Sequence, residues 1–354
     1  MKMTDRSNKV DVFRGLLFAL MVNSHALTLA SIPGDHWFYT DWWLPKGWAT
    51  VVFVILSGYG VGLVYADRPA ATRSARLQRR FIQLVSVMYV SNAAFAALRE
   101  VSTGSQALVL NWHWWLGFFT LETNWTISGV LLPTALVTLC GATVIRYVER
   151  APWTVLAVLA ALRLFTSFVT LNLAPPGDAL DGIAWFLMRR GLGGYPVIPF
   201  LLNGCFGIWL GVMRSRRMEA WRMAMALLVL LQLGFYLAFQ VDRTGYATQF
   251  LATLSPLGKF ACLFVVTHMF ERFGADLLVG AIERIGQFAL GSFIMHRVFI
   301  QLLRVAVMAC QPKGMPAEPR YVLLVAATLY LTWALCWLRL KVQVVDEPFR
   351  RLAL

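Results

Sequence analysis

The stretch "VDVFRGLLFALMVNSHALTLA", residues 10–30, is long and apolar enough to cross a membrane as one helix. It nevertheless contains Arg14 near its start and His25 toward its far end. At 3.6 residues per turn this spacing places both side chains on one helix face, about 16 Å apart along the axis. Ionisable residues inside a bilayer are costly and usually mark a functional site. The stretch therefore predicts a membrane helix with one functional polar face.

The composition extends this prediction to the whole chain of 354 residues. Hydrophobic residues make up 58% and charged residues only 14%, against about 25% charged residues in soluble domains. We therefore expect an all-α polytopic membrane protein, formed by a single transmembrane domain over residues 1–354 with no fused extra-cytoplasmic domain. The predicted spans are 10–30, 48–66, 81–98, 126–145, 152–173, 196–213, 222–240, 248–270, 286–309 and 321–338. Residues 105–121 are apolar but short and Trp-rich, which indicates an interfacial or re-entrant segment.

The net charge of +14 tests this layout. With a cytoplasmic N-terminus, most Lys and Arg residues fall in the inside segments, as the positive-inside rule requires. This distribution predicts ten helices with both termini in the cytoplasm. It also accounts for the basic composition, so no nucleic-acid partner is expected. The five cysteines lie scattered in apolar runs without metal-ligand spacing, and no metal is expected.

Several polar residues could be structural instead of functional. Arg14 could snorkel to the headgroups, and His25 could be a hydrogen-bonded structural histidine. Their alignment on one face weakens both alternatives. A second pair, His296 and Arg297, lies in the ninth predicted span.

A basic cluster at residues 73–80, "RSARLQRR", precedes the third predicted span. It could serve only as the positive-inside signal. It could also clamp phosphate groups, which guanidinium groups bind in a bidentate manner. A basic inner rim, a cavity and a deep histidine together suggest an acyl-CoA site, with the CoA phosphates on Arg76, Arg79 and Arg80. Histidine suits proton removal from a hydroxyl because its ordinary pKa is near 6.5.

At these residues the chain resembles the integral membrane acyltransferase family 3, whose first helix has an Arg-Gly pair followed by a histidine at this spacing. Here the match is Arg14, Gly15 and His25. Three further stretches are similar to that family: "VVFVILSGYGVGL" at 51–63, "IGQFALGSFIMH" at 285–296 and "VDEPFRRL" at 345–352. The first helix and "YPVIPFLLNGCFGIWLG" at 195–211 also resemble heparan-type glucosaminide N-acetyltransferases, which share transmembrane acyl transfer.

The resemblance implies ten core helices, acyl-CoA as co-substrate and a contact of Ser57 and Tyr59 with that co-substrate. The chain departs from the family in two places. The family's Arg-x-x-Arg pattern fits either Arg76 and Arg79 or, with Gln83 in the second place, Arg80. The family's Trp-Ser-Leu-x-x-x-Glu stretch is replaced by "NWTISGVLLP", which has no carboxylate after the tryptophan.

The first outer loop, "GDHWFYTDWWLPKGW" at 34–48, is rich in aromatic residues and carboxylates. A sugar ring could stack on Trp37 while Asp35 and Asp41 accept hydroxyl protons. The alternative is an ordinary aromatic belt at the membrane interface. Glu122 follows a second Trp-rich stretch, and with His296 and Arg297 it completes the predicted acceptor site.

These observations predict an O-acyltransferase of the bacterial inner membrane. It would move an acyl group, most simply acetyl from acetyl-CoA, to a hydroxyl of an extra-cytoplasmic or lipid-linked glycan, as in polysaccharide O-acetylation. His25 would be the general base or a transient acyl carrier, and Arg14 would hold the donor or polarise its carbonyl. The rival hypothesis is a transporter of an anion or a proton-coupled solute that uses the same buried cations. A bare scaffold would leave those cations unexplained.

Overall fold

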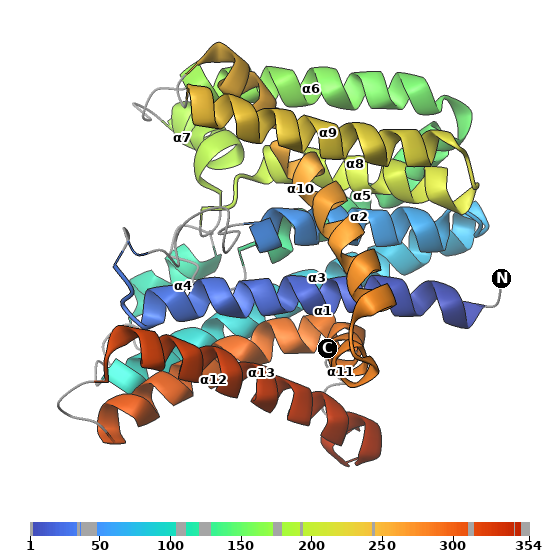
Figure 1. Cartoon of the computed structure of the whole chain (residues 1–354). Coiled ribbons are helices and arrows are strands. Elements are labelled where there is room, and N and C mark those ends of the chain that lie inside the picture. Colours follow the sequence, from blue (N-terminus) through green and yellow to red (C-terminus); the bar gives the residue numbers. More distant parts are fainter. Residues whose placement is uncertain are drawn as a thin grey trace. The chain divides into compact units, whose positions relative to one another are not determined.

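The computed structural model describes residues 3–33, 36, 48–103, 111–119, 129–172, 179–191, 194–242, 245–310, 315–342 and 344–347. Within these ranges the chain is helical and contains no strand, as predicted (Figure 1). Ten of the described helices are long and apolar enough to cross a membrane. The protein is therefore an integral membrane protein.

The ten span-length helices match the ten predicted spans in order. They are α1 (Met3–Leu29), α2 (Trp48–Tyr65), α3 (Ala70–Thr103), α5 (Leu131–Arg150), α6 (Pro152–Asn172), α8 (Val197–Ser215), α9 (Ala220–Val241), α10 (Tyr246–Phe273), α12 (Ala289–Cys310) and α13 (Ala317–Lys341). The shorter elements are α4 (Trp112–Phe119), α7 (Ala179–Trp185), the π-helix η2 (Phe186–Arg190) and α11 (Asp276–Gln287). Helix α4 lies in the Trp-rich stretch and is too short to span, as predicted.

Several predicted boundaries are wrong. Helix α3 begins at Ala70, well before the predicted start at 81, because Ala and Arg are good helix formers and the basic cluster is itself helical. Helix α5 begins at Leu131 and carries its polar last turn to Arg150, past the predicted end at 145. The predicted span 286–309 is interrupted at Phe288, where α11 ends and α12 begins. Apolar windows locate spans, but they miss polar turns that continue a helix.

The chain divides into two compact units. Unit 1 comprises residues 1–50, 91–123 and 266–354, and unit 2 comprises residues 51–90 and 124–265. Unit 1 thus contains α1, α4, α11, α12 and α13, while unit 2 contains most of α2 and all of α5 to α9. Helices α3 and α10 are divided between the two units.

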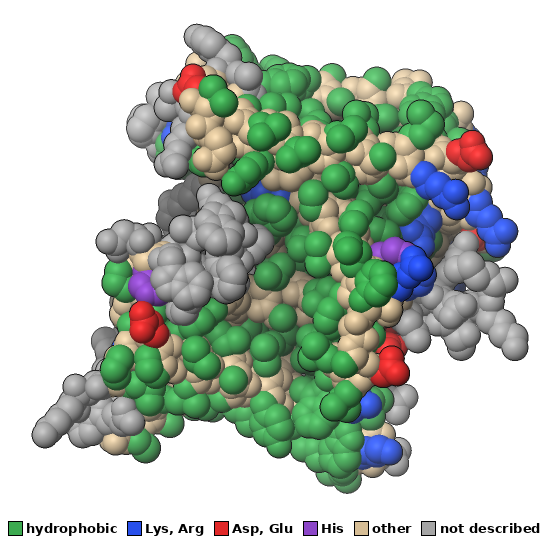
Figure 2. Space-filling view, viewed as in Figure 1, with side chains coloured by type: hydrophobic (Ala, Val, Ile, Leu, Met, Phe, Trp, Pro, Cys, Tyr) green, Lys and Arg blue, Asp and Glu red, His purple; other side chains and the backbone are tan. Residues whose placement is uncertain are grey.

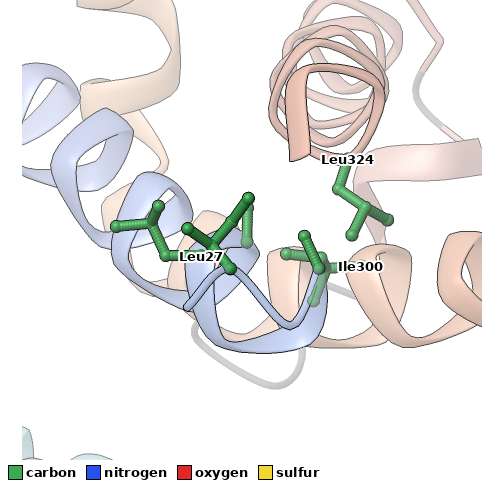
Figure 3. Packing of buried hydrophobic residues seen from close by; sticks show 6 residues of the cluster. Leu27, Ile300 and Leu324 are labelled. Atoms are coloured by element: carbon green, nitrogen blue, oxygen red, sulfur yellow. The ribbon is translucent and has the colours of Figure 1, made fainter. Parts of the chain in front are cut away.

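Unit 1 is assembled around α1. Glycines allow α11 to lie directly on it: a Cβ at Gly15 would be 2.1 Å from the Ile282 carbonyl oxygen. At its other end, α1 packs with α12 and α13 through a buried apolar cluster. Figure 3 shows Leu27 of α1, Ile300 of α12 and Leu324 of α13 converging there. In a bilayer such side chains hold the three helices together through close van der Waals packing.

Unit 2 has α8 as its most enclosed helix. A Cβ at Gly58 of α2 would be 1.9 Å from the Gly204 carbonyl oxygen of α8, so the two backbones touch, as small residues allow in membrane helices. Helix α9 instead exposes Leu227, Leu230 and Leu233, as expected for a lipid-facing helix. Apolar side chains dominate the helix flanks in Figure 2, and basic side chains gather at the turn between α8 and α9.

Candidate active site

The structure brings together two histidines that are distant in the sequence. His25 of α1 and His296 of α12 have ring centroids 5.4 Å apart, with the ring planes 20° from parallel. Both helices belong to unit 1. The sequence predicted His25 as a catalytic residue and His296 as an acceptor-binding residue. The structure places these two predicted site residues in contact.

His296 is completely buried. The Phe18 ring meets it edge-on at 5.3 Å, and the Phe293 ring lies at 5.9 Å. Its Nδ1 is 3.3 Å from the Ser292 carbonyl oxygen, whereas its Nε2 is buried without a hydrogen-bond partner among the described residues. A carbonyl can only accept, so Nδ1 carries the proton and Nε2 presents a lone pair.

Ser292 is itself held in place. Its hydroxyl is 3.2 Å from the Ile285 carbonyl oxygen, to which it donates, and 3.4 Å from the Cys336 sulfur. The serine and the histidine of the "SFIMH" stretch are therefore joined by a hydrogen bond across one helical turn. The sequence resemblance identified both residues but did not show that the serine fixes the histidine through its backbone.

His25 is in a different situation from its neighbour. Its side chain is only partly buried, and no hydrogen bond connects it to another described residue. Along α1 it lies between two apolar clusters, one with Phe18 and Val22 and the other with Ala26 and Leu27. The imidazole is thus a polar group available to a ligand, beside His296 and between two apolar clusters.

Arg14 lies on the same helix as His25, which confirms that one continuous helix carries both. Its Nη1 is 3.0 Å from the Asp11 carboxylate, one turn earlier, and about a third of the side chain is exposed. Gly15, beside it, permits the close approach of α11. Arg14 is therefore oriented by a carboxylate and still accessible.

Arg297, next to His296 on α12, lies with its guanidinium 5.4 Å from the centre of the Phe95 ring. This is within the range of a cation–π contact. Phe95 belongs to the part of α3 that lies in unit 1. The predicted acceptor residues His296 and Arg297 are thus both positioned by aromatic rings, Phe18 and Phe95 respectively.

The comparisons with known proteins agree with this geometry. The family model described as an acyltransferase domain, acyltransferase family 3, matches residues 7–337, almost the whole chain. The chain belongs to acyltransferase family 3. Neither the curated proteins nor the solved structures contain a match to it. The relation to heparan-type glucosaminide N-acetyltransferases stays a prediction.

In this acyltransferase, the basic cluster of α3 is not uniform. Arg73 is buried and contacts Glu149 of α5 through both of its terminal nitrogens, at 3.1 and 3.5 Å. Glu149 also lies 3.4 Å from Arg216. Arg76 and Arg79 are exposed, and Arg80 is partly buried with its Nη1 3.5 Å from Gln83. Arg73 is therefore held in an ion pair between two helices, whereas the side chains of Arg76 and Arg79 are exposed.

The Ser-Gly-Tyr stretch of α2 lies in unit 2. The Ser57 hydroxyl donates to the Phe53 carbonyl at 2.8 Å, within its own helix. Tyr59 is buried, with its ring 5.8 Å from Phe260 and 6.2 Å from Phe264. The structure thus gives Tyr59 a place in the core of unit 2, and its predicted contact with acyl-CoA stays a prediction.

Most of the predicted acceptor residues lie outside the described residues. They are Asp35, Trp37 and Asp41 of the first outer loop, and Glu122 after the second Trp-rich stretch. His36 is described, and its Nε2 is 2.9 Å from a Glu318 carboxylate oxygen at the start of α13. Within the described ranges, no group of three His, Cys, Asp or Glu side chains could hold a metal ion.

Sequence reasoning missed several polar contacts of unit 1. Asp11 was not assigned a role, although its spacing from Arg14 permits an i,i+3 pair. Asn23 is buried and accepts a hydrogen bond from the Tyr321 hydroxyl, which ties α1 to α13. A buried asparagine two residues before His25 was the available signal, because amides inside a membrane protein need partners.

Proposed function

We propose that this membrane acyltransferase transfers an acyl group, most simply acetyl, from cytoplasmic acyl-CoA to a hydroxyl of an extra-cytoplasmic or lipid-linked glycan in the bacterial inner membrane. The observation that carries the proposal is the environment of His25. A partly accessible imidazole without a described hydrogen bond lies beside a fully buried histidine, in a chain of an acyltransferase family. A neutral imidazole in such a site suits proton removal from a hydroxyl.

In the proposed reaction, a ring nitrogen of His25 takes the proton of the acceptor hydroxyl. The hydroxyl oxygen attacks the thioester carbonyl, a new C–O bond forms, and the C–S bond breaks. CoA leaves as a thiolate and receives the proton from the His25 imidazolium. Atoms and charge balance without a metal or a redox partner. In a variant of this scheme the imidazole itself carries the acyl group between two successive transfers.

Arg14 supports the donor side of the proposal. Its pair with Asp11 is partly exposed, and exposed ion pairs contribute little stability. The guanidinium can therefore bind an anionic or carbonyl oxygen of the donor. Arg76, Arg79 and Arg80 are the proposed CoA phosphate ligands, and the exposure of Arg76 and Arg79 supports that role. Ser57 and Tyr59 remain proposed contacts of the donor.

The acceptor side rests on His296 and Arg297, with Asp35, Trp37, Asp41 and Glu122 proposed from the sequence. The His25 ring and the Arg297 guanidinium offer hydrogen bonds to sugar hydroxyls. Both His25 and His296 lie among apolar side chains, which lowers competition from water.

The direct test uses purified protein in lipid nanodiscs with acetyl-labelled acetyl-CoA. We expect free CoA to be released and the labelled acetyl group to appear as acetate or on a simple alkyl glycoside. His25→Ala serves as the inactive control. Release of CoA at equal rates from the wild type and His25→Ala would contradict the proposal.

One observation favours the rival transporter. Arg163 lies in the middle of the α6 span, and its buried Nε has no hydrogen-bond partner among the described residues. Such a cation could belong to an anion path. Proteoliposomes distinguish the two functions, because a transporter moves a solute in the absence of acyl-CoA and an acyltransferase does not.

A further inference from the structure

We infer that His296 is a positioning residue for His25. Its Nε2 lone pair would accept the N–H of the His25 ring nitrogen that faces away from the substrate, and so fix which His25 nitrogen is free to take a proton. The inference rests on the proposed function and gives His296 a positioning role in place of the acceptor contact suggested by the sequence.

The first step is the tautomer of His296. Its Nδ1 donates to the Ser292 carbonyl, which leaves Nε2 as an acceptor. That nitrogen is buried and unpartnered among the described residues. A buried acceptor without a donor is unfavourable, so such groups nearly always have a partner in some functional state.

The second step is the identity of the donor. The Phe18 and Phe293 rings that meet His296 carry no N–H or O–H group. The remaining ring against it is His25, at 5.4 Å between centroids. Two imidazoles joined by an N–H···N hydrogen bond have centroids about 5 Å apart, given about 2.9 Å between the nitrogens and the half-width of each ring. The observed separation is close to that value. The ring planes lie 20° from parallel and no hydrogen bond joins the two rings here, so the His25 side chain must rotate to turn a ring edge and its N–H toward Nε2.

The consequence is a chain of polarised groups that ends at the backbone. The Ser292 carbonyl accepts from His296 Nδ1–H, and His296 Nε2 accepts from an N–H of His25. The other nitrogen of His25 then has its lone pair directed at the acceptor hydroxyl. When His25 takes that proton it becomes an imidazolium, whose second N–H stays on His296. The proton later leaves with CoA, and His296 neither gains nor loses one. A base oriented by a third group is a recurrent catalytic arrangement.

Ser292 makes this anchor rigid. Its hydroxyl donates to the Ile285 carbonyl of α11, so the carbonyl that fixes His296 belongs to a residue tied to a second helix. Partners that orient a histidine through its other nitrogen typically affect activity about 10–100-fold in metal sites, which gives the scale expected here.

The test compares His296→Phe with His296→Gln in full-length protein in lipid nanodiscs, with acetyl-CoA and methyl glucoside as probes. Phenylalanine keeps a ring of similar shape between Phe18 and Phe293 but offers no acceptor. Glutamine can place a side-chain oxygen near the Nε2 position but does not titrate. We expect His296→Phe to lower kcat about 10–100-fold with the KM for acetyl-CoA within about twofold. We expect His296→Gln to recover most of that loss.

Three results would overturn the inference. Wild-type activity of His296→Phe would show that the ring only fills space. A His296→Gln variant as inactive as His296→Phe would show that His296 itself takes the proton. A raised KM with unchanged kcat would show that His296 binds a substrate. An inactive wild type would instead refute the proposed function, and the inference would fall with it.

A measurement independent of turnover covers the case in which His296→Phe folds poorly. In ¹⁵N spectra of histidine-labelled protein, His25→Gln identifies the His25 signals among the five histidines. We expect one His25 tautomer in the wild type and in His296→Gln. A mixed tautomer population in the wild type would refute the positioning role.

Discussion

Gly286 of α11 lies against Asp11 of α1 so closely that a Cβ at the glycine would be 1.7 Å from the Asp11 carbonyl oxygen. No side chain fits in that space without moving one of the helices. Asp11 is also the residue that pairs with Arg14. The position of the proposed donor-binding arginine therefore depends on a glycine in a different helix.

Gly286→Ala should accordingly lower both thermal stability and acyl transfer, because α11 must move away from α1. The matched control is Gly280→Ala in the same helix, where an added Cβ meets nothing within 4 Å. Alanine favours a helix by about 1 kcal/mol over glycine, so the control should be neutral or slightly stabilising. Unfolding temperatures of both variants in the same detergent provide the comparison, and equal effects would contradict the close-packing argument.

A second glycine contact predicts the stability of unit 2. A Cβ at Gly207 of α8 would be 2.1 Å from the Ile55 carbonyl oxygen of α2, whereas one at Gly234 of α9 meets nothing within 4 Å. Gly207→Ala should therefore lower the unfolding temperature, and Gly234→Ala should not. The same Cβ would lie 2.9 Å from the backbone nitrogen of Tyr59, a proposed donor contact, so surviving Gly207→Ala protein should also show a raised KM for acetyl-CoA.

The arginines of α3 should separate into two functional groups. Arg73→Gln removes the buried partner of Glu149 but leaves that carboxylate paired with Arg216, so the cost should be below about 3 kcal/mol, the cost of breaking a buried pair completely. It should reduce stability. Arg79→Gln, at an exposed site, should leave stability unchanged and raise the KM for acetyl-CoA, since lost phosphate contacts remove binding common to the ground and transition states. Unchanged KM values in both Arg79→Gln and Arg76→Gln would indicate that the cluster serves topology alone.

Much of the fold could be predicted from the sequence, for a physical reason. A bilayer demands about 20 apolar residues per helix, and that demand is readable in a linear pattern. The alignment of Arg14 with His25 needs only the helical period. The contact of His25 with His296 could not be predicted, because it depends on how α1 and α12 pack through Leu27 and Ile300.

The same limit applies to the basic cluster. The sequence shows four arginines at similar positions along one stretch, and nothing local distinguishes them. The distinction comes from Glu149, on a helix remote in sequence, which takes Arg73 out of the accessible set. Side-chain roles that depend on which helices are neighbours are therefore not available from hydropathy or spacing.

Topology gives a fourth prediction. With both termini in the cytoplasm, single cysteines at the exposed positions Thr72 and Arg217 should be protected from a membrane-impermeant thiol reagent in sealed cells. A cysteine at exposed His113 should react. The native cysteines must first be replaced, because Cys310 is exposed. Labelling of Thr72→Cys from outside would reverse the orientation and place the basic cluster away from cytoplasmic CoA.

The last prediction concerns the two residues of α1 on which the proposed chemistry rests. His25→Gln keeps a polar side chain of similar reach but cannot take up a proton, so transfer should fall about 10²–10⁴-fold, the range of positioned acid–base catalysis. Stability and the KM for acetyl-CoA should change little. Arg14→Lys keeps the charge but loses the planar fork that binds carboxylate or phosphate with two hydrogen bonds. It should therefore retain partial activity with a raised KM for acetyl-CoA. Steady-state kinetics of the two variants test these separate roles. His25→Gln should lower kcat because the base is lost, and Arg14→Lys should raise the KM because a donor contact is weakened. If His25→Gln transferred acetyl groups at the wild-type rate, His25 would be a structural residue, and the polar face of α1 would need another explanation.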